Sequence, residues 1–432
     1  MSVFYNQNNS LMMGKISLED LANQYGTPLF VYDEQSIKKR IQDYHTGFQN
    51  GLALNEDDIL SNYYSISYAS KAFSNIQMLK LTTREGLDLD VVSLGELYMA
   101  EKAGYPTHKI HFHGNNKTED EISYALNLGI GYFVVDSFDE IERIDRLANT
   151  SVDVMIRLNP EVAAQTHQYI QTGQEDSKFG FSLSKGLAEE AINRIQESNH
   201  LNFIGIHFHL GSQIKNPTLL QLTAERVLEW SVEKNIALKH LNVGGGFSVK
   251  YLEDDEPFQV KEGIHELSSN INKICQMLNI ETPIIGIEPG RSIVGDLAVT
   301  IYEVGTIKEI PELTPYVSVD GGMSDHIRTA LYGAEYTVLP LNKKPDTPNT
   351  EMNVVGKLCE SGDIIGKNKR LPENLKVKDK LAVLSTGAYH YSMASNYNQM
   401  LKPAVVFVDG ENHRIVARRQ QLDQLLDNEI LD

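Results

Sequence analysis

The sequence contains little cysteine, few positive charges relative to its acids, and no long apolar run. Two cysteines, Cys275 and Cys359, in 432 residues cannot build a disulfide framework, and no Cys/His spacing suggests a metal site. Lys and Arg number 39 against 58 Asp and Glu, so the net charge of −19 argues against nucleic acid or an anionic membrane as partner. No apolar stretch could cross a bilayer, and the first twenty residues lack the blocks of a signal peptide. We therefore expect a cytoplasmic protein that needs no metal.

The remaining composition is that of a globular protein. Hydrophobic residues make up 41% of the chain, which excludes disorder and collagen-like repeats as its main content. A length of 432 residues predicts two or three domains, with enough chain to bury a sizeable core.

Residues 65–295 alternate short apolar runs with segments of helical periodicity, which is typical of parallel strands joined by crossover helices. We predict a (β/α)8 TIM-type barrel over residues 35–295. The polar connection at 161–181 is long enough to be a lid or binding loop. The eight predicted strands are 65–72, 87–93, 109–114, 132–137, 152–159, 203–210, 241–246 and 284–290.

After residue 295 the pattern changes to short strands separated by turns rich in Pro, Gly and Asn. This predicts an all-β domain, a barrel or a sandwich, over residues 296–432. Residues 1–34 include a strand that precedes a helix, and we expect this N-terminal segment to join the β domain. The predicted fold class is therefore α/β plus all-β.

Reactive side chains collect at the carboxyl ends of the predicted strands, where barrels of this class hold their chemistry. Alone, a lysine there is usually a solvated charge, and a histidine can be part of the core. Their coincidence at one end of one barrel favours a catalytic site. These residues are Lys71, His113, Asp136, Arg157, Asn159, His209 and Glu288.

Two glycine-containing turns follow the last two predicted strands. The turn Gly244–Gly246 would expose backbone N–H groups that can cradle a phosphate, and the alternative is a tight barrel turn. The segment Glu288–Arg291 would close on the same spot, which suits the phosphate site that barrels form after strands seven and eight. Arg291 could pair with a phosphate or a substrate carboxylate, or form a surface ion pair.

Nine sequence runs resemble the diaminopimelate decarboxylase family, pyridoxal-phosphate enzymes of the alanine-racemase-like fold group, over about residues 26–410. The first and fourth runs carry motifs shared across that group, whereas CESGD and the last run are specific to the diaminopimelate branch. The runs are YASKAF, LDLDVVSLGELYMA, IHFHGNNK, HFHLGSQI, NVGGGF, IEPGRSIVGD, DGGMSDHIRTALYGA, GKLCESGD and GAYHYSMASNYN.

The resemblance implies decarboxylation of meso-2,6-diaminopimelate to L-lysine and CO2 by pyridoxal 5'-phosphate carbanion chemistry, the last step of lysine biosynthesis. Lys71 would bond to the cofactor aldehyde, His209 would stack on the ring, and Glu288 would face the pyridine nitrogen. A carboxylate there stabilises the protonated ring, which is the stronger electron sink. The implied cofactor contacts are Lys71, His209, Ser212, Gly244, Gly245, Gly246, Glu288, Pro289, Gly290, Arg291 and Tyr389.

The substrate contacts implied by the resemblance are Arg291, Arg328, Tyr332, Glu360 and Tyr389. Guanidinium groups suit the distal carboxylate of the substrate, and an acid such as Glu360 suits its distal ammonium. Cys359 would donate the proton to the carbanion, whereas Cys275 fits core packing. The resemblance also implies a homodimer in which Cys359 and Glu360 come from one subunit and Lys71 from the other.

Two residues beside the site depart from the family pattern, because Thr329 and Lys357 replace prolines. Three alternative functions can be weighed against this resemblance, and the sequence argues against each. A decarboxylase of the same fold could act on ornithine, arginine, a D-amino acid or carboxynorspermidine, but it would not need the arginine pair or CESGD. An inactive homologue would be expected to lose Lys71 or Cys359, and a single-domain cofactor carrier would lack the β domain.

Overall fold

The computed structural model describes residues 3–161, 178–342 and 348–430, so most of the predicted lid loop at 161–181 lies outside the described residues. The chain divides into two compact units. The barrel unit consists of Arg40–Ser248 and Pro257–Gly290, and the β-rich unit consists of Met1–Lys39, Val249–Glu256 and Arg291–Asp432. The predicted domain boundaries after residues 34 and 295 stay predictions.

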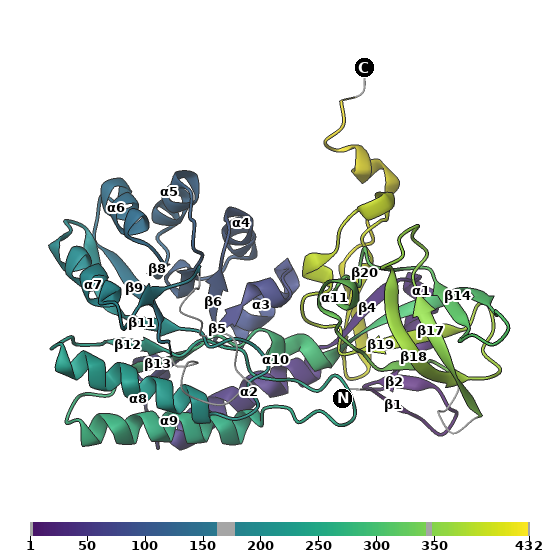
Figure 1. Ribbon diagram of the computed structural model, residues 1–432, viewed down its shortest axis with the longest axis horizontal. Coiled ribbons are helices and arrows are strands. Elements are labelled where there is room, and N and C mark those ends of the chain that lie inside the picture. The colour runs from purple at the N-terminus through teal and green to yellow at the C-terminus, as the bar shows by residue number, and fades with distance from the viewer. Residues whose placement is uncertain (1–2, 162–177, 343–347, 431–432) are drawn as a thin grey trace. The chain divides into compact units, whose positions relative to one another are not determined.

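Eight parallel strands close the barrel, as the sequence predicted (Figure 1). β9 pairs with β8 and β13 pairs with β5, which joins the two edges of the sheet. A short extra strand that the sequence did not predict, β10 (Phe181–Ser182), pairs in parallel with the carboxyl end of β9. The barrel strands are β5 (Tyr64–Ala69), β6 (Asp88–Val91), β7 (Ile110–Phe112), β8 (Tyr132–Val135), β9 (Val152–Asn159), β11 (Leu201–Phe208), β12 (His240–Asn242) and β13 (Ile284–Ile287).

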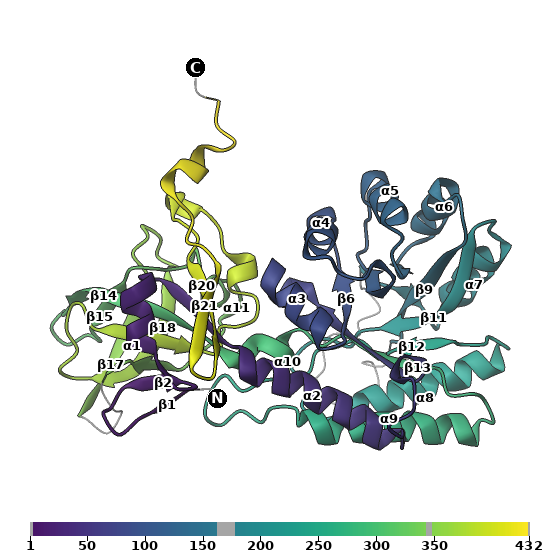
Figure 2. The same cartoon turned by 180° about the vertical axis from the view of Figure 1, so that it is seen from behind.

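Helices follow the strands closely because the loops end in capping residues. Ser93 accepts a hydrogen bond from the Glu96 amide, and Thr118 forms a capping box with Glu121. α8 and α9 lie side by side in both views (Figures 1 and 2). The helices are α3 (Ile76–Arg84), α4 (Leu94–Ala103), α5 (Glu119–Leu128), α6 (Phe138–Leu147), α7 (Leu187–Glu197), α8 (Thr218–Glu233) and α9 (Val260–Met277), and α2 (Glu34–Gly51) begins in the sequence of the β-rich unit.

The β-rich unit is organised around one long strand, β14 (Ala298–Lys308). It pairs with β4 (Leu29–Asp33) from the N-terminal segment, with β15 (Tyr316–Val319) and with β19 (Lys380–Leu384). The other elements are β1 (Val3–Tyr5), β2 (Leu11–Met13), β3 (Ile16–Ser17), α1 (Leu18–Tyr25), α10 (Arg291–Val294), α11 (Arg328–Tyr332), β16 (Val338–Pro340), β17 (Asn349–Val355), β18 (Ile364–Pro372), β20 (Ala404–Asp409) and β21 (Asn412–Ala417).

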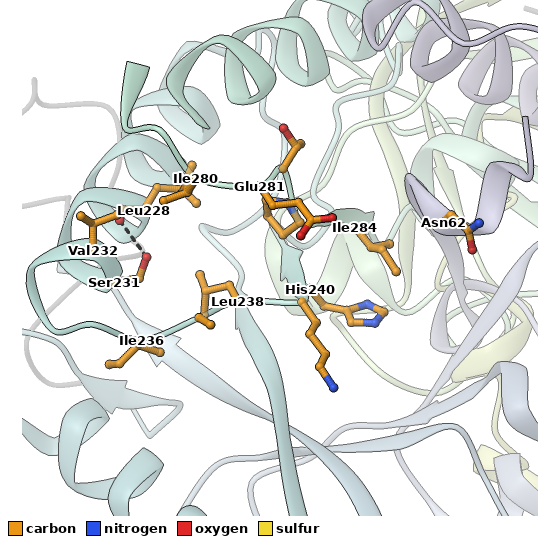
Figure 3. A pocket seen from close by; sticks show the side chains of 14 residues that line it. Asn62, Leu228, Ser231, Val232, Ile236, Leu238, His240, Ile280, Glu281 and Ile284 are labelled. Atoms are coloured by element: carbon orange, nitrogen blue, oxygen red, sulfur yellow. Dashed lines mark hydrogen bonds between the residues drawn. The ribbon is translucent and has the colours of Figure 1, made fainter. Parts of the chain in front are cut away.

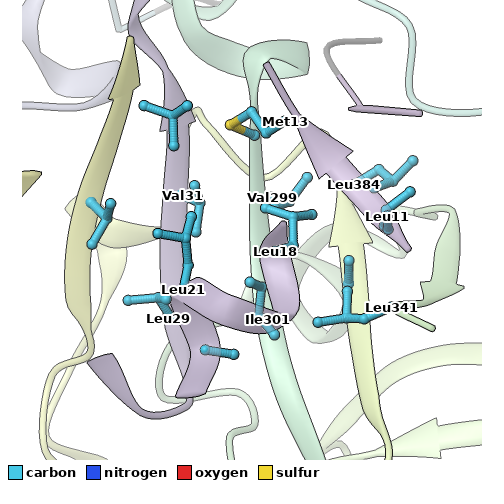
Figure 4. Close-up of a cluster of buried hydrophobic side chains, with 14 of the residues drawn as sticks. Leu11, Met13, Leu18, Leu21, Leu29, Val31, Val299, Ile301, Leu341 and Leu384 are labelled. Carbon is cyan, nitrogen blue, oxygen red and sulfur yellow. The ribbon is translucent and has the colours of Figure 1, made fainter. Parts of the chain in front are cut away.

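Paired apolar side chains form the core of this unit (Figure 4). Val31 on β4 lies opposite Val299 on β14, Leu29 lies opposite Ile301, and all four are buried. Burying a side chain of this size contributes about 1.5–3 kcal/mol, so this register fixes the N-terminal segment to β14. Among the described residues, no helix is both long and apolar enough for a membrane span.

Candidate active site

Lys71 lies at the carboxyl end of the first barrel strand. It occupies the single turn Ser70–Ala72 that follows β5, and its side chain is 50% exposed. Its Nζ lies 4.0 Å from Oδ2 of Asp90, which lies at the end of β6 and is buried. The structure thus places a half-exposed amine beside a buried carboxylate at this strand end.

Glu288, which follows β13, is buried and surrounded by three nitrogen atoms. Its Oε1 lies 2.8 Å from Asn242 Nδ2 and 3.0 Å from His113 Nε2, and its Oε2 lies 3.0 Å from His207 Nε2. Of these neighbours, His113 was among the predicted strand-end residues. His207 and Asn242 were missed, although His207 precedes His209 by two residues and therefore lies on the same face of β11.

Burial acts to raise the pKa of Glu288, but the two histidines outweigh it and hold the pKa well below its usual range. The carboxylate is therefore ionised at neutral pH. Burial also lowers the pKa of His207, so this histidine contacts Glu288 as a neutral N–H donor. A fixed negative charge at the end of β13 is the result.

His209 lies next to the glycine turn that follows β12. Its Nδ1 accepts a hydrogen bond from the Gly245 amide at 3.3 Å, and burial, with the nearby charges of Lys71 and Arg157, lowers its pKa to about 3. The ring is thus neutral at neutral pH. A Cβ at Gly245 would lie 2.0 Å from the Glu288 carbonyl oxygen, and Gly246 adopts a φ of +90°. Close packing alone therefore requires glycine here, and the predicted phosphate contact is a separate role.

The other predicted residues of the barrel unit lie around the same strand ends. Arg157 on β9 lies 3.8 Å from Asp136 and stacks over Phe179 at 4.3 Å. Asp136 Oδ1 accepts a hydrogen bond from the Gly180 amide at 2.5 Å, so these side chains hold the backbone that leads into β10. Asn159 is buried, and Ser212 is exposed in the loop between β11 and α8.

Two arginines of the β-rich unit share one aromatic ring. Arg291 and Arg328 lie 4.8 Å and 5.3 Å from the ring centre of Tyr389, which adopts a left-handed φ of +61°. Arg291 donates to the hydroxyl of Tyr251, and Arg328 Nε lies 3.1 Å from the hydroxyl of Tyr336. Two guanidinium groups so close to one ring repel each other, which makes the cluster receptive to a carboxylate.

Tyr332, another predicted contact, is 61% exposed, and its ring lies 4.9 Å from Arg328. Cys359 and Glu360 are both exposed on the loop between β17 and β18. Asp363 holds this loop, since its side chain accepts hydrogen bonds from the Leu358 amide at 2.8 Å and the Met323 amide at 2.6 Å.

Of the two departures from the family pattern, Thr329 has a clear structural role. Its hydroxyl lies 3.0 Å from the Ala334 carbonyl, 3.2 Å from the Ile365 carbonyl and 3.2 Å from His326 Nε2. These contacts tie α11, which carries Arg328, to β18. A proline could not make them. Lys357 is exposed, and its amide donates to the Gly321 carbonyl at 3.1 Å.

Two cavities of the barrel unit lie away from these residues, at the amino ends of the strands. One, of about 590 Å³, is mainly apolar and lies among α8 and residues 280–284 (Figure 3). The second, of about 760 Å³, has polar and apolar lining in equal parts and includes His45, Asp88, His111 and Asp153. Neither cavity is lined by Lys71 or Glu288. In TIM barrels, residues at this end of the strands serve stability rather than catalysis.

The cofactor class is given by a family model. Residues 35–295 match the model described as "Pyridoxal-dependent decarboxylase, pyridoxal binding domain". The chain is 54% identical over 430 residues to the diaminopimelate decarboxylase of Staphylococcus aureus (strain COL), which covers 99% of this chain and 100% of the relative. It is 44% identical to that of Bacillus subtilis (strain 168), over 97% of this chain and 95% of the relative.

A solved structure agrees with these sequence relatives. The diaminopimelate decarboxylase of M. jannaschii matches with a TM-score of 0.92 and 31% identity, over 100% of this chain and 98% of that chain. The fold and the strand-end residues thus define a pyridoxal-dependent decarboxylase. More narrowly, the chain belongs to the diaminopimelate decarboxylase family, and the resemblance drawn from its motifs is confirmed.

The residues of the barrel unit fit this cofactor. Lys71 offers an accessible amine, and Glu288 offers an ionised carboxylate among nitrogen donors. Within the described part of the chain, Asp90 Oδ1 is buried without a hydrogen-bond partner. An unpartnered buried polar atom beside the Lys71 amine is expected where a polar ligand completes the site.

Proposed function

We propose that the chain removes CO2 from meso-2,6-diaminopimelate to give L-lysine, the last step of lysine biosynthesis, with pyridoxal 5'-phosphate as cofactor. The observation that carries this proposal is the pairing of an accessible Lys71 with a buried, ionised Glu288 at the ends of adjacent strands. The family to which the chain belongs supports it.

The cofactor, when bound, supplies a sink for the electron pair left as CO2 departs. Lys71 would hold it through its aldehyde carbon, and Glu288 would keep a proton on its ring nitrogen. His209, whose neutral ring carries no opposing charge, would cover one ring face. Ser212, the turn Gly244–Gly246 and the segment Pro289–Arg291, with Tyr389, would hold the phosphate.

The β-rich unit carries the groups that would select the substrate. Arg291 and Arg328 would bind the distal carboxylate, Tyr332 and Tyr389 would line its path, and Glu360 would bind the distal ammonium. Ornithine and lysine have no distal carboxylate, so they would leave two guanidinium groups uncompensated. Cys359, as a thiol on an exposed loop, would return a proton to the carbon from which CO2 has left.

We further infer a homodimer with shared sites, in which Cys359 and Glu360 of one subunit complete the site around Lys71 of the other. The exposure of Cys359 and Glu360 on a loop supports this arrangement, because residues that complete a partner's site must lie at the surface. The cytoplasmic location stays a prediction.

The activity is tested by incubating the purified protein and pyridoxal 5'-phosphate with meso-diaminopimelate, ornithine, lysine or arginine, and measuring CO2 and amine products. We expect meso-diaminopimelate to be converted to lysine. Ornithine, lysine and arginine should not be decarboxylated at comparable rates. Faster turnover of ornithine or lysine would refute the substrate assignment. Borohydride reduction and peptide mapping should place the cofactor on Lys71, while a Lys71→Ala protein remains unlabelled.

A further inference from the structure

The neighbours of Glu288 leave its carboxylate with limited freedom. Asn242 and His113 both face Oε1, from β12 and from the loop after β7, whereas His207 on β11 donates to Oε2. A carboxylate offers about four acceptor positions. Three nitrogen neighbours leave one position, and it lies on Oε2.

We propose that His113 and His207 are positioning residues that keep the Glu288 carboxylate ionised and fixed, so that it can hold the proton on the ring nitrogen of the cofactor. This inference rests on the proposed function and deepens it. Neither histidine is given a role by the cofactor and substrate contacts described above. Both act through Glu288.

The surroundings of His113 support this role over simple core packing. Its Nε2 lies 3.0 Å from Glu288 and 3.8 Å from Oδ1 of Asp90, and Asp90 lies 4.0 Å from Lys71. His113 therefore lies between two buried carboxylates, those of Asp90 and Glu288. An imidazole that only filled space would not require acids on two sides.

His207 contributes on the opposite side. Its ring meets that of His113 edge to face, with centroids 4.9 Å apart. It is 1% exposed, and its Nδ1 is buried without a hydrogen-bond partner among the described residues. With its Nε2–H directed at Glu288, this ring contributes a neutral donor. The ionised state of Glu288 thus depends on both rings.

The charged and titratable groups near Glu288 come from most strands of the barrel, and all of them bear on its protonation. Lys71 and Arg157 are the nearby basic groups, and Asp90 is the nearby acid. The set is Lys71, Asp90, His111, His113, Tyr132, Arg157, His207 and His209. The test must therefore isolate the two histidines by substituting them singly.

The experiment compares His113→Leu, His113→Gln, His207→Leu and His207→Gln with the wild type. The leucines remove the N–H donor, and the glutamines keep an N–H donor without a titratable ring. We expect each leucine to weaken cofactor binding about tenfold and to lower kcat about 10²-fold, within the range of positioned acid–base groups. Because loss of donors raises the pKa of Glu288, the acid-side change in the absorbance of the bound cofactor should move to higher pH.

A double-mutant cycle with Glu288→Gln separates positioning from structure. If the histidines act through Glu288, their substitutions should change cofactor affinity less than about twofold in the Glu288→Gln background. Losses of equal size in both backgrounds would overturn the proposal. Should a leucine variant fail to fold, the glutamine variants carry the same cycle, and each glutamine variant should retain more activity than the corresponding leucine variant because it keeps an N–H donor.

His240→Gln, at the amino end of β12, is the matched control and should leave the absorbance titration unchanged. His113, His207 and Glu288 also lie close enough to share a metal ion, since their ligand atoms are within 4.8 Å of one another. Zn²⁺ binding to the cofactor-free protein that is lost in His113→Gln, with no change in the pH titration, would assign the cluster to a metal and refute positioning. If the wild type binds no cofactor at all, the proposed function is refuted, and that result is distinct from a failure of the positioning role.

Discussion

Lys117 and Glu140 form an ion pair inside the barrel unit, with Nζ and Oε1 2.6 Å apart and neither side chain more than 2% exposed. Nζ also donates to the carbonyls of Gly114 and Val134 at 2.9 Å each, and Glu140 accepts from the Asp136 amide at 3.0 Å. The pair therefore ties together the loops after β7 and β8. These are the loops that carry His113 and Asp136.

We expect Lys117→Met to lower the free energy of unfolding by about 3–5 kcal/mol, because it leaves a buried carboxylate without its partner. Urea denaturation measures this loss. A Lys117→Met/Glu140→Met double variant should be less destabilised than the sum of the two single variants. Lys102→Met, which removes a half-exposed pair with Glu101, is the control and should cost less than about 1 kcal/mol. A loss at Lys117 as small as that of the control would contradict the argument.

Asp325, in the β-rich unit, should make stability depend on pH. Burial, assisted by the charges of Asp320 and Asp363, raises its pKa to about 7. In the unfolded chain the pKa is about 3.9, so the folded state binds more protons between the two values. The contribution of Asp325 to the free energy of unfolding therefore falls as pH rises from about 4 to 7, and is unfavourable above that range.

Asp325→Asn removes this dependence, so the stability of the variant relative to the wild type should increase from pH 5 to pH 8. Urea midpoints at each pH provide the measurement. Asp139→Asn changes an exposed aspartate and should give a difference that does not vary with pH in this way. A constant difference for Asp325→Asn would show that this carboxyl is ionised in the folded protein throughout.

Glu288→Gln should keep the cofactor bound but lose about 10²- to 10⁴-fold in decarboxylation rate, because a neutral amide does not hold the ring proton. Absorbance reports the bound cofactor, and CO2 release reports the rate. Glu281→Gln, exposed before the same strand, should behave as the wild type. Near-normal turnover of Glu288→Gln would mean that the ring does not depend on this residue.

Tyr336→Phe should raise KM for meso-diaminopimelate about tenfold with little change in kcat. The hydroxyl orients Arg328 through a 3.1 Å contact, and an arginine that binds the distal carboxylate acts equally in the ground and transition states. Steady-state kinetics separates the two constants. Tyr316→Phe, on the exposed side of β15, is the control. An equal fall in kcat would place Arg328 nearer to the reacting carbon than we infer.

The strand-end residues were predictable because a parallel barrel brings the carboxyl ends of all its strands to one face, whatever the loops do. Lys71, His209 and Glu288 followed from that rule. His207, Asn242 and Asp90 lie in the runs HFHLGSQI, NVGGGF and LDLDVVSLGELYMA, but they were given no role, because the sequence does not show which side chains a strand residue meets. Tyr251 could not be found either, since it contacts Arg291 from 40 positions away in the sequence. Tyr336 follows Arg328 by only eight residues, but nothing in the sequence shows that the two side chains meet.

The shared site is tested by mixing two inactive proteins. Lys71→Ala and Cys359→Ala should each be nearly inactive, because one loses the cofactor linkage and the other the proton donor. If the two residues serve one site from different subunits, subunit exchange restores activity. A random mixture holds about half heterodimers, each with one intact site of two, so about a quarter of full activity is the ceiling. Exchange is verified separately with differently tagged subunits. Absence of recovery despite that exchange would place both residues in the site of one subunit, or show that the thiol is not required.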